Sequence, residues 1–218
     1  MLTVKEVYEA IDAFAPFASQ ESWDNSGLLV GGMAQPADRI LTTLDISEAI
    51  VAQAVAEQVQ LVVAHHPVIF SPLKTLPPDS PVYQLAAHGI AAICVHTPLD
   101  MAPLGLNTFA HTLLEKPLAL QGTQEVLEPS WTDGRGFGWI DTSARTWTPQ
   151  TLAQTLQTAF GEVRYSAAER SIRKIAYCSG SAASMLELAA AKGCDALITG
   201  DIKHDRWYAA EFAGIALF

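Results

Sequence analysis

The sequence has few basic residues. Thirteen Lys and Arg residues stand against 23 Asp and Glu residues, which gives a formal net charge of −10. Sequence-independent binding to nucleic acid depends on Lys and Arg displacing counterions from phosphates, so this charge balance disfavours it. A local basic groove would still be compatible with the composition.

Long hydrophobic runs are also missing. No apolar run reaches the roughly 20 residues that a membrane-spanning helix needs, so we expect no membrane partner. The N-terminus does not have the pattern of a secretion signal, because charged residues interrupt it at Lys5, Glu6, Glu9 and Asp12.

Cysteine is scarce as well. The three cysteines are Cys94, Cys178 and Cys194, and they form no Cys-x-x-Cys pair. An odd number without metal-ligand spacing is typical of reduced thiols buried in a core. We therefore expect a cytoplasmic protein.

What is present indicates an α/β fold. Half of the 218 residues are apolar, enough for a well-buried core. In the first half, Thr3 and Glu6 have the spacing of a capping box and predict a helix to about residue 14. The pattern predicts further helices at 48–58, 82–88 and 106–114, and strands at 28–30, 39–44, 61–64 and 90–95. Buried strands separated by helices are typical of a mostly parallel sheet covered on both faces.

The second half repeats this style. Strands are expected at 136–141, 172–178, 196–198 and 215–218, and helices at 149–160, 181–191 and 206–212. The stretch 115–129 shows no periodicity, so we place a domain boundary there. We expect an N-terminal α/β subdomain, 1–120, that carries the metal ligands, and a second α/β subdomain, 121–218, with mostly parallel or mixed sheets.

The sharpest motif is His65-His66-Pro67, directly after the predicted strand 61–64. Ligands of open α/β sheets bind beyond the carboxyl ends of the strands. Adjacent imidazoles in an extended segment diverge, so the pair suits two ions about 3.5–4 Å apart better than a single ion. The alternative interpretation is one packed loop histidine and one solvated histidine.

A second motif, His96-Thr97-Pro98-Leu99-Asp100, follows the strand 90–95 and should open on the same edge of the sheet. We predict Asp100 as a metal ligand, with a turn or helix-capping role as the alternative. His96 could be a ligand, but we favour a residue that orients a ligand by hydrogen bonding.

Other polar segments are weaker candidates for a site. They have turn, capping or exposed-surface roles as alternatives, and they are Trp23–Gly27, Asp45, Thr199–Asp201, His204, His88 and His111. The sequence has no phosphate-binding loop, no His-Glu-x-x-His helix and no Gly-x-Ser-x-Gly elbow.

Taken in order, these motifs resemble the Nif-three-like family, whose members are also called GTP cyclohydrolase 1 type 2 homologues. The segments that carry the resemblance are Ser22–Leu28, Ala64–Pro67, His96–Asp100, Gly136–Gly138 and Thr199–Asp201. The resemblance implies two α/β subdomains, a dinuclear divalent-metal site and often a ring-shaped homohexamer. It places His65, His66 and Asp100 on family metal ligands.

The resemblance also has departures. The family's remaining His and Glu ligands come from a late segment after a strand like 215–218, where this sequence stops. We expect that the chain continues there and that the site as given is open on one side. Pro98 stands where the family usually has Asn, and Lys203-His204-Asp205 replaces a Lys-Tyr-His motif.

Two functions from different classes follow. The first is a dinuclear metal-dependent hydrolase of unknown substrate, in which two ions activate water and His96 shuttles protons. Imidazole and carboxylate ligands suit zinc, iron, manganese, cobalt or nickel without choosing among them. The alternative is a non-enzymatic regulatory or scaffold protein that binds metal and acts through protein partners.

Overall fold

The computed structural model describes residues 1–166 and 169–218. The chain divides into two compact units, Met1–Ala102 (unit 1) and Pro103–Phe218 (unit 2), each built around its own sheet. The predicted boundary near residue 120 lies after the helix α5 (Leu106–Glu115), whereas the observed division lies before it.

Unit 1 contains a four-stranded mixed sheet in the order β1-β4-β3-β2. Strands β2, β3 and β4 are parallel, and β1 runs antiparallel to β4. The elements of unit 1 are α1 (Val4–Phe14), η1 (Phe17–Ser19), β1 (Gly27–Val30), β2 (Ile40–Thr43), α2 (Glu48–Ala56), β3 (Leu61–Ala64), α3 (Pro81–Ala87), β4 (Ala91–Cys94) and α4 (Thr97–Met101).

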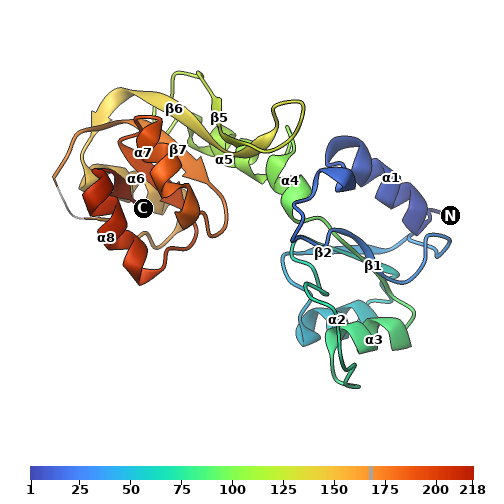
Figure 1. Ribbon diagram of the computed structural model, residues 1–218. Coiled ribbons are helices and arrows are strands. Elements are labelled where there is room, and N and C mark those ends of the chain that lie inside the picture. Colours follow the sequence, from blue (N-terminus) through green and yellow to red (C-terminus); the bar gives the residue numbers. More distant parts are fainter. Residues whose placement is uncertain (167–168) are drawn as a thin grey trace. The chain divides into compact units, whose positions relative to one another are not determined.

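Helices cover both faces of this sheet. Along β3 and β4, alternate residues point to opposite sides. Leu61 and Ile93 pack with α1, whereas Val62 and Cys94 pack with α2 and α3 (Figure 1). Because both faces are buried, the carboxyl ends of β3 and β4 are where polar side chains from this sheet can gather.

Unit 2 contains a five-stranded mixed sheet in the order β5-β6-β7-β8-β9. The pairs β5–β6 and β6–β7 are antiparallel, and the pairs β7–β8 and β8–β9 are parallel. Besides α5, its elements are β5 (Glu125–Pro129), β6 (Gly136–Trp147), α6 (Pro149–Phe160), β7 (Ile172–Cys178), η2 (Ala183–Met185), α7 (Leu186–Ala191), β8 (Ala196–Thr199), α8 (His204–Ala213) and β9 (Ala216–Leu217).

Two apolar cores sandwich the sheet of unit 2. Helices α5 and α6 contribute to one, and α7 and α8 to the other. A buried polar contact also joins α5 to the sheet: His111 Nε2 lies 2.9 Å from Asp141 Oδ2 on β6. Asp141 accepts further hydrogen bonds from the backbone N–H groups of Gly122 and Thr123. These contacts explain why α5 belongs to unit 2.

The predicted α/β class with mixed sheets is confirmed. The capping box of α1 is present, and β3 has the predicted bounds. Three elements were missed, the short helices η1 and α4 and the strand β5. Strand β6 also continues to Trp147, well past the predicted end at residue 141.

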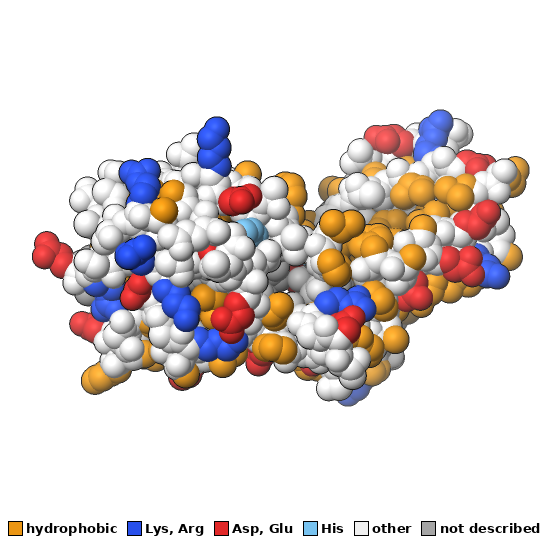
Figure 2. Space-filling view, turned by 90° about the horizontal axis from the view of Figure 1, so that it is seen from above, with side chains coloured by type: hydrophobic (Ala, Val, Ile, Leu, Met, Phe, Trp, Pro, Cys, Tyr) orange, Lys and Arg blue, Asp and Glu red, His pale blue; other side chains and the backbone are white. Residues whose placement is uncertain are grey.

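The cysteines and the charged side chains lie in different environments, the former in the core and the latter on the surface. All three cysteines are buried thiols, and burial raises the pKa of Cys94 and of Cys194 to about 11. Within the described residues, no helix combines the length and hydropathy needed to cross a membrane. Figure 2 shows acidic and basic side chains interspersed on the visible face.

Candidate metal centre

The two predicted site segments follow neighbouring strands. Strands β3 and β4 are parallel and in register, with Ala64 opposite Cys94. His65 comes directly after β3, and His96 follows β4 by two residues. The segments therefore open on the same edge of the sheet, as the sequence predicts.

Three histidines gather at this edge. His65, His66 and His96 each offer one ligand nitrogen, and these nitrogens all lie within 4.8 Å of one another. His65 and His96 are partly buried, and His66 is more exposed. The sequence pairs His65 with His66 but favours only an orienting role for His96, whereas the structure places His96 beside both.

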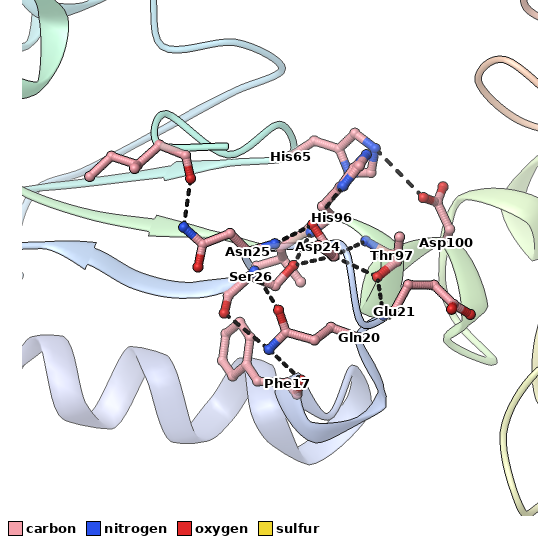
Figure 3. Close-up of polar contacts among 12 residues, drawn as sticks. Phe17, Gln20, Glu21, Asp24, Asn25, Ser26, His65, His96, Thr97 and Asp100 are labelled. Carbon is pink, nitrogen blue, oxygen red and sulfur yellow. Dashed lines mark hydrogen bonds and ion pairs between the residues drawn. The ribbon is translucent and has the colours of Figure 1, made fainter. Parts of the chain in front are cut away.

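The imidazole of His65 is oriented by the backbone. Its Nδ1 lies 3.0 Å from the carbonyl oxygen of Val95, and because a carbonyl only accepts, Nδ1 carries the proton. Nε2 is thus left with its lone pair, 3.9 Å from Asp100 Oδ2 (Figure 3). Burial lowers the pKa of His65 despite the nearby Asp100, which keeps the ring neutral and able to bind a metal.

The imidazole of His66 is oriented by a carboxylate. Nδ1 lies 2.7 Å from Asp45 Oδ1, at the end of β2. The two side chains are 45% and 65% exposed, so solvent weakens this pair. From the sequence, Asp45 is only a weak candidate for the site. Its place after β2 puts it beside the end of β3, close to His66 in the loop that follows β3.

The imidazole of His96 is oriented by a buried carboxylate. Nδ1 lies 2.8 Å from Asp24 Oδ1, and the Asp24 side chain is fully buried (Figure 3). Asp24 also accepts hydrogen bonds from the hydroxyl groups of Ser26 and Thr97, at 2.9 and 2.5 Å, and from the backbone N–H of Asn25.

This network fixes the charge of Asp24. Burial alone would raise the pKa of the Asp24 carboxyl, but the hydrogen bonds from His96, Thr97 and Ser26 outweigh burial and hold the pKa well below its ordinary value. The hydrogen bond to Asp24 in turn raises the pKa of His96. A permanent carboxylate therefore keeps the proton of His96 on Nδ1 and leaves Nε2 facing the other histidines.

Asp100 reaches the cluster because the segment after β4 is helical. Residues Thr97–Met101 form α4, and the backbone N–H of Asp100 bonds to the His96 carbonyl at 3.2 Å. One turn thus brings the Asp100 carboxylate toward His65. Pro98 lies in the first turn of α4, where a missing N–H leaves no helical bond unmade, so Pro98 is compatible with the site.

The donor set fits a divalent metal ion. Each of the three imidazoles has Nδ1 held by an oxygen and Nε2 available, the arrangement that orients histidine ligands in metalloproteins. Asp100 adds a carboxylate beside them. Nitrogen and oxygen ligands of this kind suit first-row transition metals and zinc.

The remaining candidates have other roles. Thr199 and Gly200 bond to the Gly180 carbonyl in unit 2 and form a turn there. His204 begins α8, exposed, and its ring packs against Tyr208. His111 lies in α5 of unit 2, where its contact with Asp141 serves the packing of that unit.

Comparison with known proteins agrees with these observations. The family model described as Duf34/NIF3 (NGG1p interacting factor 3) matches residues 2–218. The GTP cyclohydrolase 1 type 2 of Helicobacter pylori strain 26695 is 34% identical over 224 residues, which cover 100% of this chain and 84% of that protein. The GTP cyclohydrolase 1 type 2 homolog of Streptococcus pneumoniae is 33% identical, covering 92% of this chain and 77% of that protein.

Solved structures share the fold. A Bacillus cereus protein related to NIF3 matches with a TM-score of 0.88 at 18% identity, over 100% of this chain and 87% of that one. A Staphylococcus aureus hypothetical protein matches with a TM-score of 0.85 at 24% identity, over 99% of this chain and 84% of that one. The match over nearly the whole length and the identity to curated relatives together establish that this chain belongs to the Duf34/NIF3 family.

Proposed function

We propose that this chain is a divalent-metal-dependent hydrolase whose metal ligands are His65, His66 and Asp100, joined by His96. The observation that carries the proposal is the anchoring of three imidazoles. In each, an oxygen acceptor holds Nδ1, so that Nε2 is the nitrogen available to an ion. An arrangement that served packing alone would not need three such anchors at one sheet edge.

The side chains at this site have different roles. When bound, a divalent ion would lower the pKa of a water ligand and polarise an electrophilic centre of the substrate. His65, neutral because of its burial, supplies a lone pair without first losing a proton. Asp100 supplies negative charge that offsets the charge of the ion. The pair of His66 and Asp45 is exposed, which leaves that side open for substrate to enter.

We further propose a dinuclear centre in a homo-oligomeric, ring-shaped protein, on the strength of the family resemblance. His65, His66, His96 and Asp100 of unit 1 would hold a first ion, and a second ion beside it would share the task of activating water and substrate. Metal analysis of the purified full-length protein should give close to two ions per chain. Sedimentation should give six chains per particle.

The reaction to test first is hydrolysis of a purine ring in a nucleoside triphosphate. The curated relatives are named for GTP cyclohydrolase activity, and this supports the choice. Water attack on a ring carbon is also chemistry that an ion-activated water can perform. A nucleotide and phosphoester panel would be assayed by absorbance and by phosphate release, with each of the five candidate metals.

The decisive experiment combines metal content with turnover. His65→Ala should lose bound metal and activity together, and chelation of the unmodified protein should abolish activity that added metal restores. His88→Ala is the matched control, because His88 ends α3 and is exposed. Full metal binding by His65→Ala would overturn the proposal.

The rival function is a metal-binding scaffold. The family description names an interacting factor, which favours this second candidate. A scaffold would keep its partners when His65→Ala removes the metal, and it would show no turnover with any metal. Affinity capture with the two proteins in parallel would separate the two functions.

A further inference from the structure

Two large aromatic side chains stand exposed beside the metal centre. Trp23 is 55% exposed and Phe70 is 53% exposed. Their ring centroids lie 5.9 and 6.5 Å from the ring of His96, and 6.2 Å from each other. We call this pair of residues the aromatic corner.

The network around Asp24 also holds the aromatic corner in place. Trp23 directly precedes Asp24, whose carboxylate is fixed by His96, Thr97 and Ser26. Phe70 directly follows Ile69, whose carbonyl accepts a hydrogen bond of 2.6 Å from the Asn25 side-chain amide. The same few residues thus orient a proposed metal ligand and position both aromatic rings.

The exposure of Trp23 and Phe70 next to the proposed metal centre indicates that these rings contact a bound molecule. Single exposed apolar side chains are common on protein surfaces and need no explanation. Here two exposed rings lie next to each other and next to the ring of a proposed metal ligand. Such apolar area at a functional centre marks a binding surface. Both rings meet His96 at interplanar angles of 75°, so neither is stacked face to face on the imidazole.

We propose that the aromatic corner binds a planar, unsaturated ring of the substrate and so selects ring-containing substrates for the metal centre. This inference rests on the proposed function. The planes of Trp23 and Phe70 meet at 44°, so a flat ring lying on one face has its edge covered by the other. Stacked and edge-to-face contacts are the arrangements that aromatic rings prefer. Trp23 and Phe70 are therefore specificity-determining residues.

A matched pair of probes tests this in the metal-loaded full chain. Acetohydroxamate and benzohydroxamate chelate a metal through the same group and differ by a phenyl ring. Stacking on exposed aromatic side chains should make benzohydroxamate bind about tenfold tighter. Both dissociation constants would be measured by isothermal titration calorimetry, with the zinc-loaded protein and again after chelation.

Variants assign the difference to the aromatic corner. Trp23→Ala and Phe70→Ala should each reduce the preference for benzohydroxamate, and the double variant should abolish it, while the affinity for acetohydroxamate stays unchanged. Trp23→Phe should retain most of the preference. Phe14→Ala is the matched control, because Phe14 is an exposed ring on α1 in the same unit. Circular dichroism would confirm folding, and Phe70→Leu provides a milder variant.

The outcomes separate this inference from the proposed function. If neither probe binds in a metal-dependent way, the metal centre itself is refuted, and this inference with it. If both probes bind equally well, or if the preference survives in the double variant, the inference is wrong and the metal centre stands. If the variants change only the oligomeric state in sedimentation, the corner is an interface between copies of the chain, which also overturns the inference.

Discussion

At the scale of single residues, the buried carboxylate of Asp24 has the largest predicted effect on the site without being a ligand. Asp24→Asn removes the charge that keeps the proton of His96 on Nδ1, while the amide can still occupy the same volume. Loss of such an orienting partner typically lowers metal affinity 10- to 100-fold. We expect a loss of this size in a competition titration against a fluorescent chelator.

Asp45→Asn is the matched comparison for Asp24→Asn. Asp45 orients His66 as Asp24 orients His96, but the Asp45 pair is exposed to solvent, so its loss should cost less. An equal or larger loss of metal affinity in Asp45→Asn would contradict the view that burial makes Asp24 the more important anchor.

A second prediction at this scale concerns stability and pH. Burial alone would raise the pKa of Asp141, but hydrogen bonds from His111, Thr142 and Thr123 outweigh it and lower the pKa below the ordinary 3.8. A lowered pKa stabilises the fold fully above the ordinary value, and the stabilisation is lost as pH falls through the folded-state value. Asp141→Asn should therefore destabilise unit 2 by about 2 kcal/mol at pH 7.

The difference in free energy of unfolding between the unmodified protein and Asp141→Asn should shrink in acid. Urea denaturation of both proteins between pH 7 and pH 2 would show the curves starting to converge below about pH 4, where the unfolded carboxyl takes up a proton. They should meet only below the lowered pKa of the native carboxyl. A gap that persists unchanged at pH 2 would mean that the loss comes from altered packing and not from the charge.

At the scale of elements, the strand β6 depends on a glycine. Gly138 has φ of +65°, in the left-handed region, and a Cβ there would collide with the backbone carbonyl oxygen of Tyr177 on β7. Gly138→Ala should destabilise unit 2 by more than about 2 kcal/mol, because neither backbone can move without breaking the β6–β7 ladder. Urea denaturation would measure the loss.

Gly134→Ala is the control for this strand. Gly134 also has positive φ, at +85°, but nothing lies within 4 Å of a Cβ there. It should cost only the conformational penalty of about 1 kcal/mol. Equal losses in the two variants would show that the backbone conformation, and not the close approach of β7, makes Gly138 necessary.

Local signals explain which elements could be predicted. Helix α1 has its capping box, and Pro149 and Gly161 mark the ends of α6. Helix α4 was missed because five residues are too few to give a periodic pattern, and it forms where β4 ends. Strand β5 was missed because Glu125 and Glu128 make it polar, and only its antiparallel pairing with β6 defines it.

The candidate site was predictable in outline for a similar reason. Parallel neighbouring strands bring their carboxyl ends together, so the proximity of His65 to the segment containing Asp100 follows from the sequence. The placement of the His96 ring does not, because it depends on Asp24, 72 residues away in the chain. Long-range pairs of this kind leave no periodic or local signal.

At the scale of the whole molecule, all proposed metal ligands lie in unit 1, whose apolar core is separate from that of unit 2. The apolar clusters of unit 1 and unit 2 share no residue. A ligand that binds only native unit 1 should stabilise that unit by about 2.7 kcal/mol at a hundredfold excess over its dissociation constant. In differential scanning calorimetry, added metal should therefore raise the unfolding temperature of unit 1 and leave that of unit 2 unchanged.

Site variants give this prediction its control. In His65→Ala, the added metal should leave both transitions in place, because the ion has lost its ligand. If metal raises the transition of unit 2 in the unmodified protein, then the metal contacts residues 103–218 as well, and a centre confined to unit 1 is wrong.

The buried thiols have a practical consequence for all of these experiments. With pKa values near 11, Cys94 and Cys194 carry almost no thiolate at neutral pH, and the thiolate is the form that oxidises and captures soft metals. Stocks of the folded protein should thus survive storage in air without dithiothreitol, itself a strong chelator. Zinc, cobalt and nickel loading can then be compared in thiol-free buffer, where the ion count reflects the proposed centre and not an added chelator.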